Sequence, residues 1–224
     1  MGFIIKHRLI CRNSNHIEGS RLSHDQTRYI FETNTIGVEN EVLNVDDVLE
    51  TANHFRCIDM IIDHAKTTLS ENFIKDLHLT LKNGTSDSRK EGFVVGDYKK
   101  VPNEVGGMNT ALSEEVPGRM KGLLKEYNGK KEKTFEDILD FHVRFERIHP
   151  FQDGNGRAAR LIEKWFLIEQ INDKATAVQL EKNYFKNLER YYSNIKKMGI
   201  EYETLDYSKA LDFLVMTAKG LETQ

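Results

Sequence analysis

The stretch HPFQDGNGRAAR, residues 149–160, decides how this 224-residue chain folds. Pro150 disfavours helical backbone at the residue before it, so it should end the helix that leads in. Gly154 and Gly156 allow a tight turn and a close approach of the backbone to a ligand. A second helix can begin at Asn155, with its free amide groups pointing back into the turn. The stretch therefore predicts two helices joined by a turn that forms an anion site.

The charged side chains of this stretch indicate a phosphate site with a base. Arg157 and Arg160 lie three positions apart on one helix face, and both can donate charge-assisted hydrogen bonds to phosphate oxygens. Asp153 is a natural ligand for Mg²⁺, which binds few carboxylates together with phosphate oxygens. His149 has an ordinary pKa near neutrality and suits a general base. From these residue types and positions alone we infer a nucleotide or phosphoester site.

Working outward from this stretch, apolar residues recur every three or four positions over much of the chain, which is the pattern of amphipathic helices. Ser70 can cap one helix, and residues 134–137 look like a capping box. The stretch 93–107 has β-branched and aromatic residues broken by turn formers, so we expect a short exposed hairpin there. The fold class is therefore mostly α with one small hairpin. We expect helices over residues 46–65, 70–81, 116–127, 134–148, 155–166, 180–197 and 205–218.

The composition excludes several classes of protein. The chain has 32 basic and 35 acidic residues and a net charge of −3, which argues against a general nucleic-acid binder. No run approaches the roughly 18 apolar residues of a membrane-spanning helix, and no targeting signal is evident. With two cysteines, a disulfide framework is not expected and a reduced, cytoplasmic setting fits best. We therefore expect neither nucleic acid nor a membrane as a partner.

Residues 149–160 match the Fic motif HxFx(D/E)GNGRxxR at every defined position, so the chain resembles Fic family proteins. The resemblance covers roughly residues 14–215. It implies the Fic fold, a helical bundle with a small β-hairpin flap, and a single Fic domain over residues 1–224. Within that domain it implies motif helices over residues 134–172 and a flap over residues 93–107.

What the resemblance implies is protein AMPylation, the transfer of AMP from ATP to a Ser, Thr or Tyr hydroxyl of a target protein with release of pyrophosphate. By position, His149 is the catalytic base and Asp153 binds Mg²⁺ or Mn²⁺. Tyr184 resembles an adenine-side residue, with core packing an equal alternative. Self-modification and homo-oligomer formation stay open. The other implied nucleotide contacts are Gly154, Asn155, Gly156, Arg157 and Arg160 in the turn, and Asn103, Glu104, Val105 and Gly106 in the flap.

A second motif lies near the N-terminus, where residues 14–19 read SNHIEG and fit the inhibitory pattern (S/T)xxxE(G/N) of Fic proteins. A helix end with Gly19 as its C-cap is a compatible structural reading. The resemblance implies an inhibitory helix within residues 10–24. In it, Glu18 would contact Arg160 and keep it from the γ-phosphate of ATP, while Ser14 would steady the helix.

Other functions remain as alternatives at the same site. The inhibitory glutamate could also support removal of AMP from a target. A Doc-like phosphotransferase is a second alternative, although Doc-type motifs carry Lys where this chain has Gly156. A nucleotide-binding scaffold without catalysis is a third, and the intact His149, Asp153 and Arg157 argue against it.

Most of the other polar residues on the predicted helices receive structural roles. We expect four histidines at the edge of the core or on the surface, and Glu146 facing solvent or capping a helix. Tyr191 and Tyr192 suit packing, with self-modification as the second option. The four histidines are His54, His64, His78 and His142.

Overall fold

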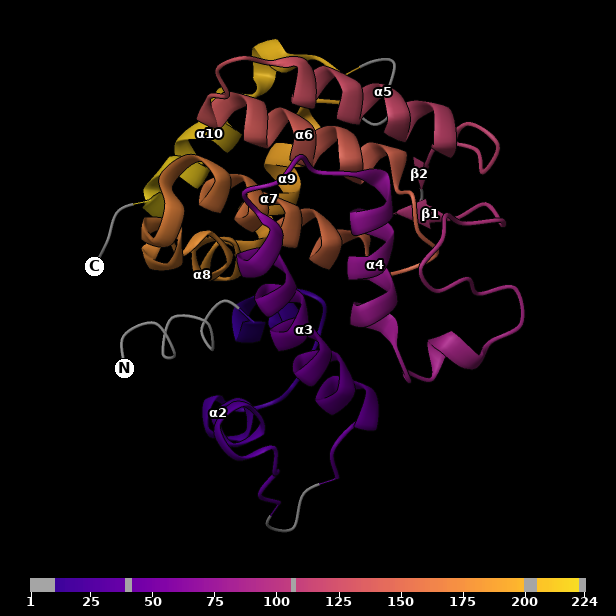
Figure 1. Ribbon diagram of the computed structural model, residues 1–224, viewed down its shortest axis with the longest axis vertical. Helices are drawn as coiled ribbons and strands as arrows, with labels where there is room; N and C mark the ends of the chain where they lie inside the picture. Colours follow the sequence, from indigo (N-terminus) through magenta and orange to yellow (C-terminus); the bar gives the residue numbers. More distant parts are fainter. Residues whose placement is uncertain (1–10, 39–41, 106–107, 200–204, 222–224) are drawn as a thin grey trace.

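Two antiparallel helices, α6 (Phe135–Ile148) and α7 (Asn155–Ile171), form the centre of the computed structural model (Figure 1). The capping box predicted at the start of α6 is present. The Thr134 hydroxyl accepts from the backbone N–H of Asp137 at 3.3 Å, and the Asp137 carboxylate accepts from the backbone N–H of Thr134 at 2.8 Å. Trp165 and Phe166 of α7 are completely buried, so this helix lies inside the core.

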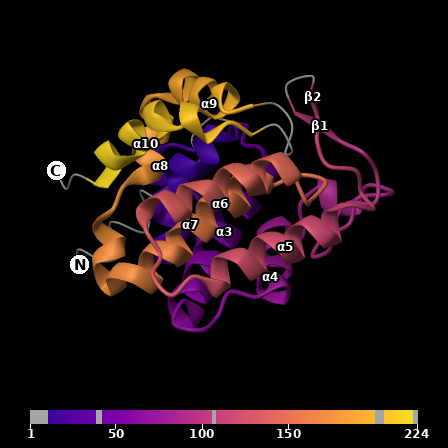
Figure 2. The ribbon, with the colours of Figure 1, turned by 90° about the horizontal axis from the view of Figure 1, so that it is seen from above.

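The remaining helices cover α6 and α7 from two sides. On one side lie α5 (Val116–Gly129), which packs on α6, and α4 (Glu71–Lys82), which packs on α7 together with α3 (Val45–His64). Figure 2 shows the C-terminal helices on the other side. They are α8 (Leu180–Lys186), α9 (Leu188–Lys197) and α10 (Leu211–Ala218), and α2 (His24–Thr33) packs on α3. The mostly α fold is confirmed.

The structure describes residues 11–38, 42–105, 108–199 and 205–221. Residues 11–17 are helical. Within the described part, no helix combines the length and the apolar character needed to cross a bilayer. Cys11 and Cys57 are buried free thiols. Short 3₁₀ turns complete the described structure at Asp87–Arg89, Asn172–Ala177, Tyr207–Lys209 and Lys219–Leu221.

The small hairpin is confirmed, but its strands are shorter than the predicted stretch 93–107. Strand β1 (Glu104–Val105) pairs antiparallel with β2 (Met108–Asn109). Among residues 93–103 there is no strand, because Gly96 takes a positive φ of 78° and Lys99 is buried, with its backbone N–H bonded to the Pro150 carbonyl at 2.9 Å. This segment is held by the motif turn instead of by a partner strand.

Two predicted helices have different extents in the structure. The single helix expected over 180–197 is two helices, α8 and α9, which meet at Asn187. Asn187 has φ −123° and its side-chain amide donates to the Asn183 carbonyl at 2.9 Å, a local bond that competes with helix continuation. The helix expected over 205–218 begins only at Leu211, because the Asp206 carboxylate accepts from the Ser208 amide and caps a 3₁₀ turn.

Removing the capping hydroxyl of α6 should destabilise the fold measurably. We expect Thr134→Ala to lower the free energy of unfolding by about 1 kcal/mol, because the N–H of Asp137 then has no side-chain acceptor. Thr134→Ser, which keeps the hydroxyl, is the matched control and should lie close to the wild type. Urea unfolding followed by circular dichroism measures both, and equal stabilities for the two variants would contradict the assigned cap.

Candidate functional site

The turn between α6 and α7 is closed by the side chain of Asn155. Its Oδ1 accepts from the backbone N–H of Phe151 at 2.8 Å, and its Nδ2 donates to the carbonyl of the same residue at 2.8 Å. His149 and Gly154 take left-handed backbone conformations, with φ of 49° and 80°. Because a left-handed conformation costs energy for a residue with a Cβ, the fold must hold His149 in place. The turn is therefore a built and rigid feature.

His78 of α4 supports this turn from outside the motif. Its ring stacks on that of Phe151, with centroids 3.9 Å apart and planes 4° apart. Nδ1 of His78 accepts from the backbone N–H of Gly96 at 3.0 Å, so its Nε2 carries the proton and donates to the Asp153 carbonyl at 3.1 Å. The expectation that His78 lies at the core edge or surface is wrong, because its ring completes a network of buried hydrogen bonds.

Two further histidines also lie deeper than expected. His54 and His142 are each 1% exposed, whereas His64 is exposed as expected. His142 contacts the Glu163 carboxylate at 3.0 Å and the Tyr191 hydroxyl at 2.9 Å, so its burial is matched by polar partners. Since helical periodicity does not distinguish a buried histidine with partners from an apolar residue, the sequence could not separate these cases.

A cavity of about 400 Å³ opens beside the turn and brings together residues from four parts of the chain. His149 and Arg160 both line it, with Gly156 between them in sequence. Glu18 from the N-terminal segment and Val105 from β1 close it on other sides. The imidazole and one motif guanidinium thus face a common space large enough for part of a nucleotide.

The environment of His149 keeps its imidazole neutral. The side chain is 14% exposed, and burial, with a further contribution from the positive charge of Lys99, lowers the pKa of His149 to about 4. Its Nδ1 lies 3.3 Å from the Glu146 carbonyl. A carbonyl only accepts hydrogen bonds, so Nδ1 carries the proton and Nε2 keeps a free lone pair. This is the state that a general base requires.

Glu146 does not face solvent as predicted. Its side chain is 16% exposed and one carboxylate oxygen lies 4.0 Å from Nδ1 of His149. Burial raises the pKa of Glu146. Glu146 lies in the last turn of α6, next to the point where the chain leaves the helix at His149, and it lines the cavity.

Arg160 is held by the N-terminal segment through three contacts. Its Nε donates to the Ser14 hydroxyl at 2.9 Å, and its Nη2 donates to the Ser14 carbonyl at 3.1 Å and to Glu18 Oε1 at 2.6 Å. The Arg160 side chain is 1% exposed and that of Glu18 is 26% exposed. The two motifs that the sequence placed 142 positions apart therefore meet as one ion pair.

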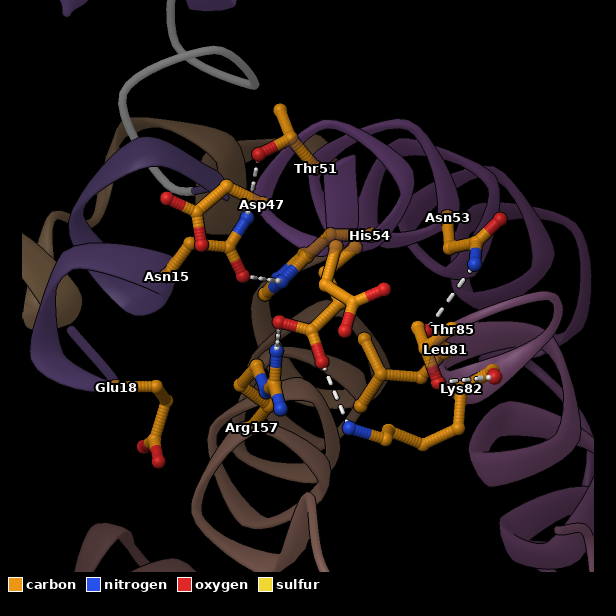
Figure 3. Close-up of polar contacts among 12 residues, drawn as sticks. Asn15, Glu18, Asp47, Thr51, Asn53, His54, Leu81, Lys82, Thr85 and Arg157 are labelled. Carbon is orange, nitrogen blue, oxygen red and sulfur yellow. Dashed lines mark hydrogen bonds and ion pairs between the residues drawn. The ribbon is translucent and has the colours of Figure 1, made fainter. Parts of the chain in front are cut away.

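The N-terminal segment is fastened to α3 by Asn15. The side chain of Asn15 donates to the Thr51 hydroxyl at 3.2 Å and its oxygen lies 3.2 Å from Nδ1 of His54 (Figure 3). Gly19 ends the helical turn with φ 95°, a conformation that favours glycine, and its N–H donates to the His16 carbonyl. The position of Glu18 is thus set by the buried contacts of Asn15 before it and by the turn at Gly19 after it.

Asp153 and Arg157 are held from outside the motif. The ammonium of Lys82 donates to Asp153 Oδ2 at 2.6 Å, and Arg157 Nη2 lies 3.4 Å from the same oxygen. Nη1 of Arg157 forms an ion pair with Glu50. Lys82 also contacts Glu50, so Arg157 of α7 and Lys82 of α4, both labelled in Figure 3, share the carboxylates of Glu50 and Asp153. Burial raises the pKa of Asp153, but the ion pairs with Lys82 and Arg157 outweigh it and hold that pKa below its usual range.

The donor set at Asp153 is compatible with a divalent cation that arrives with phosphates. No cluster of three or more metal-ligating side chains occurs within the described ranges. Asp153 is one carboxylate, its side chain is 46% exposed, and it lies beside the amides that open α7. Mg²⁺ commonly binds through one or two carboxylates plus substrate phosphates, so this single ligand fits such an ion.

The predicted flap and adenine residues fall into three groups. Asn103 joins the hairpin to the motif turn, since its Nδ2 donates to the Phe151 carbonyl at 2.9 Å. Glu104 and Val105 are exposed in β1, while Gly106 lies outside the described residues. Tyr184 is completely buried, with its hydroxyl 3.1 Å from the Glu163 carboxylate. An adenine contact by Tyr184 is therefore not available in this conformation, because the side chain fills the core.

Comparison with known proteins agrees with this geometry. Residues 68–167 match the model of the Fic/DOC family. A crystal structure of a Fic domain-containing signaling protein from Bacteroides thetaiotaomicron superimposes with a TM-score of 0.75 at 25% identity, covering 96% of this chain and 84% of that one. A Fic family protein from Desulfovibrio desulfuricans gives a TM-score of 0.80 at 21% identity, covering 97% and 63%.

Curated relatives are similar over part of their length. The protein adenylyltransferase fic-1 of Caenorhabditis elegans is 28% identical over 155 residues, which is 65% of this chain and 28% of that protein. A probable protein adenylyltransferase of Aquifex aeolicus is 30% identical over 95 residues, 39% of this chain and 27% of that protein. The matched region thus spans less than a third of each of these two relatives.

The low pKa of His149 gives a test that needs no assay of activity. We expect its ring to titrate near pH 4 in NMR spectra of the folded protein, with Nδ1 protonated in the neutral form. Between the ordinary pKa of about 6.5 and pH 4 the unfolded chain binds a proton that the folded chain does not, so His149 costs folding stability as the pH falls through this window.

The charge of Lys99 provides the matched comparison. Lys99→Met should raise the pKa of His149, because a nearby cation that disfavours the imidazolium is removed. Lys100→Met, at the exposed neighbouring position, should leave that pKa unchanged. A titration midpoint near 6.5 in the wild type would mean that His149 is solvated and would contradict the buried environment.

Proposed function

Because this chain belongs to the Fic/DOC family, we propose that it transfers AMP from ATP to a hydroxyl group of a protein target. The observation that carries the proposal is the shared cavity of His149 and Arg160, with the glycine turn at its edge. The relatives named protein adenylyltransferases support the same chemistry. A neutral imidazole, an anion-binding turn and a guanidinium are the parts that phosphoryl-centre chemistry requires.

In the proposed reaction the free Nε2 of His149 takes the proton of the target hydroxyl. The hydroxyl oxygen then forms a bond to the α-phosphorus of ATP, and the bond from that phosphorus to the bridging oxygen of the β-phosphate breaks. Pyrophosphate leaves with the electron pair, and AMP stays on the target. The pKa near 4 keeps His149 unprotonated at neutral pH, although it limits the driving force for proton transfer.

The turn supplies the groups that hold the phosphates in this proposal. The backbone amides of Gly154, Asn155 and Gly156 form the anion hole at the start of α7. Arg157 binds the β-phosphate and Arg160 the γ-phosphate. Asp153 holds Mg²⁺, and the ion when bound neutralises phosphate charge. In the flap, the exposed backbone of β1 at Glu104 and Val105 pairs with the target.

Glu18 acts as an inhibitor in the proposed scheme. Its ion pair occupies the guanidinium of Arg160, so that ATP cannot place its γ-phosphate there. Glu18 also lines the cavity itself, and a negative carboxylate in that space opposes a negative triphosphate. Charge-assisted contacts of this kind contribute about 1.5–3 kcal/mol, which amounts to roughly a ten- to hundredfold change in productive binding.

A phosphotransferase of the Doc type fits this cavity less well. A Cβ atom added at Gly156 would lie 2.6 Å from Glu18 Oε1 and 3.1 Å from Nη1 of Arg160. A lysine at this position, as in Doc-type motifs, would collide with the Glu18–Arg160 pair. Gly156 thus leaves room for the Glu18–Arg160 pair in its present arrangement, and this chain departs from the Doc-type motif at that position.

Release of Arg160 should switch the activity on. We expect Glu18→Gly to increase the transfer of label from α-³²P-labelled ATP to protein by roughly ten- to a hundredfold over the wild type. Adding His149→Ala to this variant should lower the rate by roughly 10² to 10⁴. The measurement is autoradiography after incubation with a cell lysate, with mass spectrometry of labelled proteins to find the expected gain of about 329 Da for AMP and not about 80 Da for phosphate.

A matched control uses a glutamate outside the site. Glu114→Gly, at an exposed position far from α7 in sequence, should label as weakly as the wild type. Equal labelling by the wild type and Glu18→Gly would contradict the inhibitory role of Glu18. ATP binding without any transfer in Glu18→Gly would instead support a scaffold and contradict the enzymatic proposal.

A further inference from the structure

We propose that Glu50 of α3 is a positioning residue of the phosphate site, which holds Arg157 in place for the diphosphate part of the nucleotide. This inference rests on the proposed function, because it assigns the β-phosphate to Arg157. Glu50 belongs to neither motif and lies 107 positions before Arg157 in the chain. The geometry of its carboxylate carries the inference.

The Glu50 carboxylate bridges two buried cations from different helices. Its Oε1 accepts from the Lys82 ammonium at 2.7 Å, and its Oε2 forms the ion pair with Nη1 of Arg157. The side chains of Lys82 and Arg157 are 1% and 4% exposed, and that of Glu50 is 15% exposed. We call this arrangement, formed by Glu50, Lys82 and Arg157, the Glu50 bridge.

The Glu50 bridge differs from the Glu18–Arg160 pair in ways that separate a fixed support from a movable inhibitor. Glu18 engages one guanidinium with one oxygen, is 26% exposed and lines the cavity. Glu50 engages two cations with both oxygens, comes from the 20-residue helix α3 and is absent from the lining of that cavity. Withdrawing Glu50 would leave the buried guanidinium of Arg157 with only its 3.4 Å contact to Asp153 as counter-charge, which is unfavourable.

The bridge also reaches the second phosphate-site residue, Asp153. Besides Glu50, the Lys82 ammonium contacts Asp153 Oδ2 at 2.6 Å and Asp87 Oδ2 at 3.2 Å. The aliphatic part of Lys82 packs against the turn as well, since a Cβ at Gly154 would lie 3.5 Å from its Cδ. One glutamate on α3 therefore sets the place of both the guanidinium and the cation that holds the motif carboxylate.

Arg157 retains capacity for an anion while it is held in this way. Its Nε is buried and donates no hydrogen bond to any residue that the structure describes. Nη2 has the 3.4 Å contact with Asp153, which is long for a charge-assisted hydrogen bond. Glu50 thus holds the guanidinium by Nη1, while Nε has no acceptor among the described residues and Nη2 has only a long contact.

The test compares nucleotide binding with and without a β-phosphate. In the Glu18→Gly background, which frees Arg160, we expect Glu50→Gln to weaken the binding of ADP with Mg²⁺ by about tenfold, because the neutral amide no longer fixes Arg157. Binding of AMP, which has no β-phosphate, should change by less than about twofold. Isothermal titration calorimetry measures both affinities, and thermal unfolding reports whether the variant stays folded.

Two variants serve as controls. Glu50→Asp keeps the charge and should retain more of the ADP affinity than Glu50→Gln. Asp59→Asn removes one exposed carboxylate from the same helix and should leave both affinities unchanged. These binding measurements are independent of the transfer of label, so a Glu18→Gly protein that binds nucleotides without labelling would refute the proposed function alone.

Five results would overturn the positioning role. A gain of ADP affinity in Glu50→Gln would make Glu50 a second inhibitor. An equal loss of affinity for ADP and for AMP in Glu50→Gln would make the role of Glu50 purely structural. Unfolding of Glu50→Gln, together with equal ADP and AMP affinities in Glu50→Asp, would lead to the same conclusion. An unchanged ADP affinity, or no ADP binding even in Glu18→Gly, would leave no link between the Glu50 bridge and the β-phosphate.

Discussion

The turn closed by Asn155 is the constraint on which the rest of the site depends. One side-chain amide satisfies the N–H and the carbonyl of Phe151, and this lets the backbone pass through left-handed conformations at His149 and Gly154. Because the turn is tight, His149 at the end of α6 and Gly156 at the start of α7 line the same cavity. Strain of this kind persists only where the surroundings over-determine the conformation, and here His78 and Asn103 bond to the turn from two further elements.

The burial of charged side chains is the second feature of this site, and it explains why distant segments of the chain contribute residues to it. Arg157 and Arg160 are nearly inaccessible, and a buried guanidinium without a counter-charge would be strongly destabilising. Each is matched by a glutamate from the N-terminal part of the chain, Glu50 or Glu18. The helices that precede the motif therefore serve the site directly and do more than cover its core.

The sequence predicted the site where local pattern determines structure and failed where structure depends on contacts between distant segments. The glycines, Pro150 and the cap at Thr134 act within a few residues, so the turn and the start of α6 could be derived. The motif resemblance added the contact between Glu18 and Arg160. Nothing local distinguishes Glu50 or Lys82 from an ordinary charged residue on a helix face, since their partners in the motif, Arg157 and Asp153, lie 107 and 71 positions away.

Contacts that the local pattern does not report also explain why the predicted bounds of the hairpin and of the helix over residues 180–197 differ from the structure. The segment before β1 has strand-like composition, but Lys99 is bonded to the motif turn and is buried there, so tertiary contacts override its local preference. Asn187 interrupts a pattern that is otherwise continuous from α8 to α9, because its side chain competes for a helix carbonyl. Periodicity reports which face is apolar, and it contains no information about such a competing bond.

In the proposed scheme, the two glutamate–arginine pairs have different roles, with Glu18 inhibiting the site and Glu50 supporting it. An inhibitor has to leave, so it benefits from partial exposure, a single contact and a place on the cavity wall, as Glu18 has. A support has to stay, so it benefits from a place on a long helix and from contacts with two buried cations, as Glu50 has. The same residue type thus contributes opposite effects at neighbouring arginines, and the cost of withdrawing each carboxylate decides which effect it has.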